Sequence, residues 1–312
     1  MKSADYYLNK IKKLGIRNTV CKALGYDSAY TCCYKLKNGR EYTALPLNRK
    51  EWYADPLVIK RDGRTYVFME VFDEKSHLGR IGYSEITESG WGEVKVVISE
   101  QFHLSFPTII EMNDKLYMIP ETSTADKICL YECIEFPDNW KLAKTFLEGE
   151  KIVDSIIIEN KDNRVVMLAS KCHEDNSLLY KFFEYDIVFG ETITLCVKDG
   201  VNNRQPYCNY HRNAGGVTSL DEIPLQVSSD VIYGESMVFV PRKDVIKAVS
   251  SGEILDYNRY RKLEKNDREI IGIINKNVVG IHTYSETEDY EVIDLQFFRF
   301  SIHKWKERLR LG

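Results

Sequence analysis

The sequence predicts an all-β fold, a five-bladed β-propeller with short helices at its N- and C-terminal ends. One arrangement returns about every fifty residues, which is the period of propeller blades. It consists of an acid or an aromatic residue, an apolar strand, a tight turn and a second apolar strand. The apolar runs are short and are bounded by Gly, Asn or Asp, which is typical of strands and turns. A chain of 312 residues has room for five such repeats in one closed domain.

The first three repeats are the clearest. The first spans residues 53–70, with an acid before one strand, the turn Asp62-Gly63, and an acid at the end of the next strand. The second spans residues 106–121 and the third spans residues 153–170. Each predicts the inner hairpin of one blade.

The later repeats are looser. The fourth begins near Arg204 and includes residues 216–220 and 237–240, and the fifth covers residues 269–284. Strand 29–36 is expected to complete the fifth blade and so to leave no free sheet edge. The predicted boundaries are 1–28 for an N-terminal helical segment, 29–300 for the propeller, with blades near 50–99, 103–148, 152–199, 201–250 and 255–300, and 301–312 for a basic C-terminal helix.

Composition excludes several functional classes. The formal net charge is −4, with acids and bases mixed along the chain, so we expect no nucleic-acid partner. The start of the chain lacks the apolar core of a signal peptide, and no apolar run reaches the length of a membrane span, so a cytoplasmic location is expected. The eight cysteines include no CxxC pair, which favours reduced, buried thiols over disulfides or a zinc site.

The inner strands of a propeller line a central channel, where side chains that are distant in sequence become neighbours. Asp55 and Asp154 occupy equivalent places in the first and third repeats, and Ser105, preceded by His103, occupies that place in the second. A second ring of polar side chains is expected from the ends of the following strands. That ring consists of Glu70, Glu121 and His282.

Converging carboxylates are what cleavage of a glycosidic bond requires, because one protonates the leaving oxygen and another activates water or attacks the anomeric carbon. Crowded like charges raise at least one pKa, so that one acid keeps its proton near neutral pH. We therefore predict Asp55, Asp154 and Glu121 as catalytic residues. The alternative is that an Asp before Pro caps a strand or turn. No cofactor is expected, although a Ca²⁺ ion in the channel would be consistent with converging carboxylates.

A polar and aromatic segment follows the third repeat. It contains Tyr207, His211 and Arg212, residue types that stack on sugar rings or bind carboxylates and phosphates. An ordinary surface loop and a nucleophilic pair of Cys208 with His211 are the alternatives. The predicted substrate-binding residues are Glu70, His103, Ser105, Arg204, Tyr207, His211, Glu235 and His282.

The C-terminal segment places Ile302, Trp305 and Leu309 on one helical face, with basic residues around them. This pattern fits a helix packed on the rim of the propeller, which we favour. It also fits an interfacial anchor with peripheral contact to an anionic membrane. Such an anchor would bring lipid-linked glycans within reach as substrates.

The string Ala54-Asp55-Pro56, followed by residues 62–68, resembles blade one of the five-bladed propellers of glycoside hydrolase family 43 and of the invertases and levansucrases. The resemblance implies the role of base or nucleophile for Asp55 and a tuning role for Asp154. In those families a Glu of blade four is the acid. Residues 203–209 contain no Glu, so Glu121 or Glu235 would have to replace it.

A closer resemblance extends over roughly residues 50–300. It is to the N-terminal propeller of proteins similar to glucosamine inositolphosphorylceramide transferase and to related bacterial products for surface polysaccharides. The motifs that carry it are Trp91-Gly92-Glu93, His103-Leu104-Ser105-Phe106-Pro107, Ile119-Pro120-Glu121-Thr122, Phe136-Pro137-Asp138-Asn139-Trp140, Gly215-Gly216, Gly280-Ile281-His282-Thr283-Tyr284 and Tyr290-Glu291-Val292-Ile293-Asp294. The transferase relatives have a separate glycosyltransferase domain, which we do not expect in this chain.

Two hypotheses of function follow. The first is a carbohydrate-active propeller, like a glycoside hydrolase or transglycosidase, that acts on a glycan or glycolipid intermediate of surface-polysaccharide metabolism. The second is a non-catalytic glycan-binding or scaffolding module that partners a separate glycosyltransferase. The missing blade-four acid favours the second. A propeller that binds only proteins ranks third, because it has little use for acids in its channel.

Overall fold

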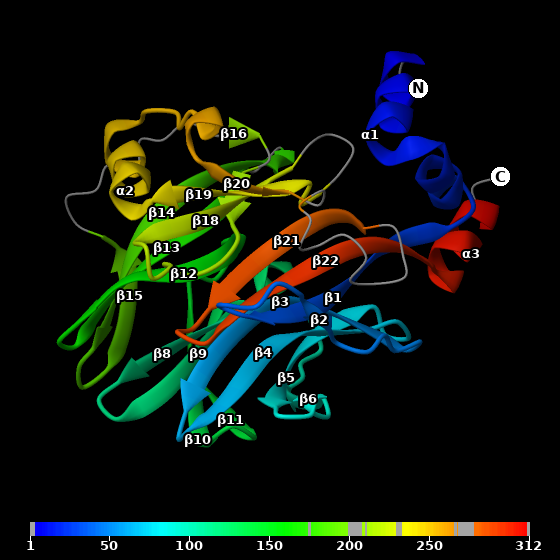
Figure 1. The fold of residues 1–312 in the computed structure, drawn as a ribbon. Helices are drawn as coiled ribbons and strands as arrows, with labels where there is room; N and C mark the ends of the chain where they lie inside the picture. The colour runs from blue at the N-terminus through cyan, green and yellow to red at the C-terminus, as the bar shows by residue number, and fades with distance from the viewer. Residues whose placement is uncertain are drawn as a thin grey trace.

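The computed structural model describes residues 4–173, 176–198, 208–209, 211–228, 233–264, 267 and 278–310. Five antiparallel sheets form the blades of a β-propeller, which confirms the predicted fold (Figure 1). The inner strands of the five blades are β3 (Glu51–Arg61), β8 (Ser105–Met112), β12 (Ile152–Lys161), β17 (His211–Asn213) and β21 (Val278–Glu286). They lie side by side around the channel, because β3 contacts β8 and β21, and β12 contacts β8 and β17. The amide of Tyr284 in β21 also donates to the carbonyl of Ala214, directly after β17.

The first three blades follow one another along the chain. The first blade consists of β3 (Glu51–Arg61), β4 (Arg64–Asp73), β5 (Leu78–Thr87), β6 (Gly90–Trp91) and β7 (Lys95–Ile98). The second consists of β8 (Ser105–Met112), β9 (Lys115–Glu121), β10 (Ile128–Glu135) and β11 (Asn139–Phe146). The third consists of β12 (Ile152–Lys161), β13 (Arg164–His173), β14 (Asn176–Phe189) and β15 (Ile193–Val197), with β16 (Cys208–Asn209) on β14.

Tight turns join the inner hairpins, as the sequence predicts. Asp62 and Gly63 have φ values of 50° and 74°, and Asn113 and Asp114 have values of 53° and 60°. Positive φ at both central residues defines the two-residue turn whose twist matches that of the flanking strands, and Gly, Asn and Asp adopt it at least cost.

The fourth blade differs from its predicted form. Within the described residues it consists of β17 (His211–Asn213), β18 (Glu222–Val227), β19 (Ser236–Pro241) and β20 (Arg261–Glu264). The helix α2 (Arg242–Ser251) lies between β19 and β20, and the sequence analysis missed it. Its buried residues Val245 and Val249 pack in one cluster with residues of β18 and β19, which explains why so short a helix is stable there.

The fifth blade joins the two ends of the propeller. It consists of β21 (Val278–Glu286), β22 (Tyr290–Phe300), β1 (Tyr26–Leu36) and β2 (Thr43–Ala44), in the order β2-β1-β22-β21. The predicted strand 29–36 lies within β1 and pairs with β22. The prediction that His282 ends a second strand is wrong, because β21 is the innermost strand of this blade. The residues 269–274, predicted as its first strand, lie outside the described residues.

A β-bulge recurs on the inner strands. Two inner-strand residues face one residue of the next strand between Ala54 and Leu57, Ser105 and Thr108, Val153 and Ile156, and Ile281 and Tyr284. In the first three blades the first bulge residue is left-handed, with φ of 53° at Asp55, 44° at Phe106 and 50° at Asp154. This conformation costs a non-glycine residue about 1–2 kcal/mol. The bulge therefore changes the direction of the side chains of these three residues, which occupy equivalent positions in their blades.

The hydrophobic core lies between neighbouring blades. Phe68 of β4 packs in one cluster with Met118 of β9, and Ile119 of β9 packs in another with Met167 of β13. Seven of the cysteines are described, and all seven are free thiols. Cys32, Cys33 and Cys129 are buried, and Cys196 is exposed.

Helix α1 (Ala4–Ala23) lies next to β1 and β22, and helix α3 (Ile302–Arg310) lies next to β1, at the same end of the molecule (Figure 1). Two 3₁₀ turns, η1 (Ser123–Ala125) and η2 (Tyr257–Arg259), complete the described secondary structure. No helix among these residues is long and apolar enough to cross a membrane.

Candidate functional site

The bulges gather two groups of charged side chains within the channel. We call Asp55, Glu70, His103, His282 and Asp294 the histidine cluster. We call Glu121, Asp154 and Arg212 the arginine cluster. The carboxylates and His282 are largely buried, so each group depends on its partners within the cluster to offset the cost of leaving water.

In the histidine cluster, the Nδ1 atom of His282 lies 3.1 Å from Asp55 Oδ1 and 3.1 Å from Asp294 Oδ2. Asp294 also accepts the backbone amides of Asp55, His282 and Thr283 at 3.0, 3.1 and 2.7 Å. Although burial opposes a charged imidazole, the carboxylates of Asp294 and Asp55 raise the pKa of His282 well above its usual 6.5. His282 is therefore protonated at neutral pH and bridges two carboxylates.

Glu70 lies beside this bridge, and its environment favours the uncharged form of the acid. Burial, followed by the negative charge of Asp55, raises the pKa of Glu70 well above its usual 4.5, which favours the protonated form of this acid. His103 Nδ1 accepts the amide of Gly79 at 2.9 Å, which places its ring proton on Nε2, 3.3 Å from Glu70 Oε1. Burial lowers the pKa of His103, so the ring is neutral.

The arginine cluster is a buried ion network. Arg212 donates to both carboxylate oxygens of Asp154, with Nη2 2.6 Å from Oδ1, and the same Nη2 lies 3.2 Å from Glu121 Oε2. Glu121 Oε2 also accepts the amide of Asp154 at 3.2 Å, and its Oε1 accepts the hydroxyl of Ser123 at 2.7 Å. Burial raises the pKa of Asp154 to about 6 against the lowering effect of Arg212, so Asp154 is ionised at neutral pH.

Aromatic rings surround both clusters. Tyr233, an exposed residue, contacts His282 through its hydroxyl at 3.2 Å and faces the guanidinium of Arg212 at 5.5 Å. From His282 a line of ring contacts leads outward, each pair with centroids 4.1–5.7 Å apart. The line consists of His282, Tyr30, Trp52, Phe72, His77 and His303.

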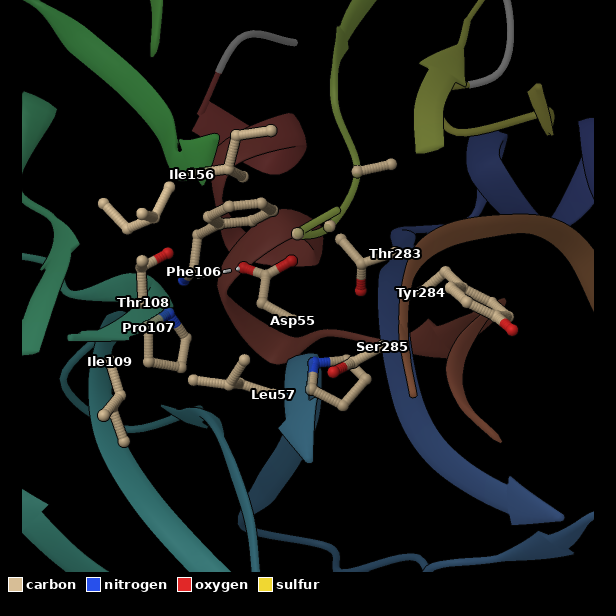
Figure 2. A pocket seen from close by; sticks show the side chains of 15 residues that line it. Asp55, Leu57, Phe106, Pro107, Thr108, Ile109, Ile156, Thr283, Tyr284 and Ser285 are labelled. Carbon is tan, nitrogen blue, oxygen red and sulfur yellow. Dashed lines mark hydrogen bonds between the residues drawn. The ribbon is translucent and has the colours of Figure 1, made fainter. Parts of the chain in front are cut away.

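The channel continues past Asp55 into a cavity of about 170 Å³. All five blades contribute to its wall. Figure 2 shows Asp55 among apolar side chains, including Leu57, Pro107 and Ile156, with a dashed line for the hydrogen bond in which the amide of Phe106 donates to Asp55 Oδ2 at 3.1 Å. Apart from the acid, this part of the channel is mainly apolar.

Asp55, His282 and Asp294 are the described residues that could hold a metal ion, since one potential ligand atom from each lies within 4.8 Å of the others. Calcium prefers six to eight oxygen ligands. Here one of the three donors is a nitrogen, and backbone amides already occupy both oxygens of Asp294. The donor set therefore does not fit Ca²⁺.

The structure brings together most of the predicted site residues. Asp55, Asp154, Glu121, Glu70, His103 and His282 all lie in the two clusters, and Ser105 is buried opposite Glu121 in the strand register. His211 instead stacks on Tyr257 with centroids 3.8 Å apart. The amide of Glu235 bonds to Val227 at the edge of blade four. Arg204 and Tyr207 lie outside the described residues.

Sequence reasoning missed Asp294 and underrated Arg212. Asp294 interrupts the apolar run from Val292 to Phe297, and an acid inside a buried strand indicates a specific partner. Arg212 takes the channel position of the fourth blade, where a glutamate was looked for and not found. The fourth blade thus supplies a cation to the acids of the second and third blades.

The family model described as "Glucosamine inositolphosphorylceramide transferase 1, N-terminal" matches residues 32–216, more than half of the chain. The chain is 31% identical to glucosamine inositolphosphorylceramide transferase 1 of Arabidopsis thaliana over 121 residues, and 26% identical to the protein of that name from Oryza sativa subsp. japonica over 108 residues. These matches cover 38% and 34% of this chain but only 15% and 14% of the relatives' lengths.

Solved structures resemble the fold at low sequence identity. A family-43 glycoside hydrolase described as thermostable matches with a TM-score of 0.45 at 14% identity, over 83% of this chain and 94% of its own. A Dyadobacter fermentans protein of unknown function matches with a TM-score of 0.49 at 7% identity, over 85% of this chain and 99% of its own. The GH62 α-L-arabinofuranosidase of Coprinopsis cinerea matches with a TM-score of 0.42 at 13% identity, over 69% of each chain.

Proposed function

The chain belongs to the family of the N-terminal region of glucosamine inositolphosphorylceramide transferase 1, and on this premise we propose that it is a glycan-binding propeller which seats a sugar against the two charged clusters. The family match includes the whole arginine cluster together with Asp55, Glu70 and His103. The proposed ligand is the sugar portion of a glycan or glycolipid intermediate in surface-polysaccharide assembly.

The observation that carries this proposal is the position of Arg212 between Asp154 and Glu121. A carboxylate held by a buried guanidinium is fixed in direction and still has lone pairs to accept hydroxyl hydrogen bonds. Carboxylates that are fixed in direction before the ligand arrives can bind the hydroxyls of a sugar at a lower entropic cost. Glu121 is poorly suited to donate a proton, because both of its oxygens already accept hydrogen bonds.

The aromatic rings complete the proposed site. Trp52 and Phe72 are stacked with centroids 4.3 Å apart, and they lie on the line of rings that starts at His282. The faces of such rings bind the C–H faces of sugars, while the polar clusters bind the hydroxyls. Tyr233, which is exposed in part and contacts His282 through its hydroxyl, is the proposed first contact.

A separate glycosyltransferase is the proposed partner. The relatives are named as transferases, which supports a transferase as the partner. We propose that the propeller holds the acceptor or the product while the transferase forms the glycosidic bond.

Glycoside cleavage is a second candidate, favoured by Glu70. An acid with a raised pKa beside the carboxylate of Asp55 is the pairing that acid-assisted cleavage uses, since one group gives a proton and the other acts as base or nucleophile. His103 Nε2 lies 3.3 Å from Glu70 Oε1, close to the acid that would give the proton.

An array of hexose-, pentose- and hexosamine-terminated glycans tests the proposal. Wild-type protein should bind a subset, and Asp55→Asn should lower the affinity at least about tenfold, the effect of roughly one lost charge-assisted bond. Asp62→Asn is the matched control, because Asp62 has a similar φ of 50° but lies exposed in the turn of the same hairpin. Binding to no glycan, or equal binding by both variants, would reject the proposal. Chromatography of the bound glycans after incubation separates binding from cleavage.

A further inference from the structure

The second half of α1 carries apolar side chains that nothing in the described structure covers. A break at Gly15 divides α1 into two helical pieces. In the second piece Ile16, Val20 and Leu24, spaced four residues apart, are 72%, 49% and 59% exposed. Residues four apart lie on the same side of a helix, so these three side chains form one apolar stripe.

The end of β22 and the start of α3 carry three more exposed apolar side chains. Phe300, Ile302 and Trp305 are each at least 45% exposed. The amide of Ser301 donates to the carbonyl of Gly25 at 3.1 Å. A Cβ added to Gly25 would lie 3.0 Å from the Trp305 backbone. The start of α3 therefore packs against the residues that follow the end of α1. We call the joined patch the helix-pair surface. It consists of Ile16, Val20, Leu24, Phe300, Ile302 and Trp305.

The two helices are also strongly basic. Their residues 4–23 and 302–310 include nine Lys or Arg and two acids, in a chain whose net charge is −4. Lys22 lies over the Phe298 ring at 4.8 Å, beside the apolar patch. A basic helix with an exposed apolar stripe and a tryptophan has the composition of elements that lie in the interface of an anionic bilayer.

We propose that the helix-pair surface binds peripherally to an anionic lipid bilayer. The apolar side chains enter the boundary between headgroups and acyl chains, and the basic residues pair with anionic headgroups. A second copy of the chain or a protein partner would also cover apolar side chains. The two helices, however, carry nine basic and only two acidic residues, which favours a partner with dense negative charge. A bilayer surface supplies that charge without needing a matching shape.

The position of the helices links the bilayer to the site. His303 of α3 contacts His77 with ring centroids 4.1 Å apart, and His77 is the outer end of the ring line within the propeller. A second cavity, of about 220 Å³, lies along this line between Trp52, Phe72, Arg299 and Ser301. Docking through α1 and α3 would hold this cavity close to the headgroups. This orientation rests on the proposed function, because it would present a lipid-linked sugar to the charged clusters.

Co-sedimentation of the full chain with vesicles tests the surface itself. Wild-type protein should sediment with vesicles that contain phosphatidylglycerol, should remain in solution with phosphatidylcholine alone, and should be released as salt increases. The triple variant Ile16→Ser, Val20→Asn, Trp305→Ala should lower the partition coefficient at least about tenfold. Leu220→Ser is the control, because Leu220 is as exposed as Ile16, at 72%, but lies in the fourth blade. Circular dichroism should show both variants folded.

Two results would overturn the proposal. One is equal binding of the phosphatidylglycerol vesicles by the wild type and the triple variant, or no binding by either. The other is a dimer of the wild type that the triple variant converts to a monomer, which would make this surface an interface between copies. Neither result depends on glycan binding, so this proposal and the proposed function fail separately.

Discussion

The imidazole of His282 lies 3.1 Å from the carboxylate of Asp55, across the seam where the last blade of the ring meets the first. The amide of Asp55 also donates to Asp294, on the strand next to that of His282. The same charged groups therefore form the candidate site and hold the two ends of the propeller together. Changes at this seam are expected to affect stability as well as binding, which makes conservative substitutions and matched controls necessary.

Stability should fall as the pH rises. The folded protein keeps a proton on Glu70 above its usual pKa of 4.5 and on His282 above its usual 6.5, whereas the unfolded chain releases both. The folded state therefore binds more protons, and rising pH favours unfolding in this window. Glu70→Gln cannot ionise, so its melting temperature should depend less on pH than that of the wild type as the pH rises above about 4.5, the usual pKa of a Glu. A variant with the same pH slope as the wild type would contradict this account.

Glycan binding should weaken as the pH falls through about 6, because Asp154 is then protonated and loses its charge. Titration calorimetry across that range, with a glycan selected on the array, measures the midpoint. Asp154→Asn should bind more weakly than the wild type and show no step near that pH. A step that survives in Asp154→Asn would assign the titration to another group.

Removal of Arg212 should be costly. Arg212→Met leaves the carboxylates of Asp154 and Glu121 buried without their cation, which should lower the free energy of unfolding by about 3–5 kcal/mol. The triple variant Arg212→Met, Asp154→Asn, Glu121→Gln removes the uncompensated charges as well and should recover much of the loss. Urea unfolding measures both. Equal stability of Arg212→Met and wild type would show that the network contributes nothing to the fold.

The junction of blades four and five gives a test of the backbone. A Cβ on Gly215 would lie 1.9 Å from the Tyr284 carbonyl oxygen, whereas one on Gly216 would meet nothing within 4 Å. Gly215→Ala should therefore lower the free energy of unfolding by about 3 kcal/mol or more, since the clash is with backbone. Gly216→Ala should be close to neutral. Similar stabilities for the two variants would show that this junction is looser than described.

The parts of the fold that repeat could be predicted from the sequence. The inner hairpins with Asp62-Gly63 and Asn113-Asp114 carry a local turn signal and an apolar period of two, and they form as expected. The fourth and fifth blades lack a clear local signal. The described part of β17 is only three residues long, and the helix α2 interrupts the fourth blade. The predicted segments 237–240 and 278–284 nevertheless lie in β19 and β21, whereas 216–220 is not a strand.

The candidate site was predictable in part, because four of its acids lie in the clear repeats of the first three blades. Asp55, Asp154, Glu70 and Glu121 were found because repetition placed them at equivalent positions. The partners Arg212 and Asp294 come from blades with a different length and rhythm, and their contacts are made across the ring. Pairing between distant blades depends on closure of the whole propeller, which no local pattern encodes.

A crystal structure of the protein with an array-selected glycan tests the central claim most directly. The account predicts a sugar ring with hydroxyls within hydrogen-bond distance of the Asp55 and Asp154 carboxylates and one face near the Trp52–Phe72 pair. A sugar bound elsewhere on the propeller, with both clusters unchanged and without ligand contact, would contradict it.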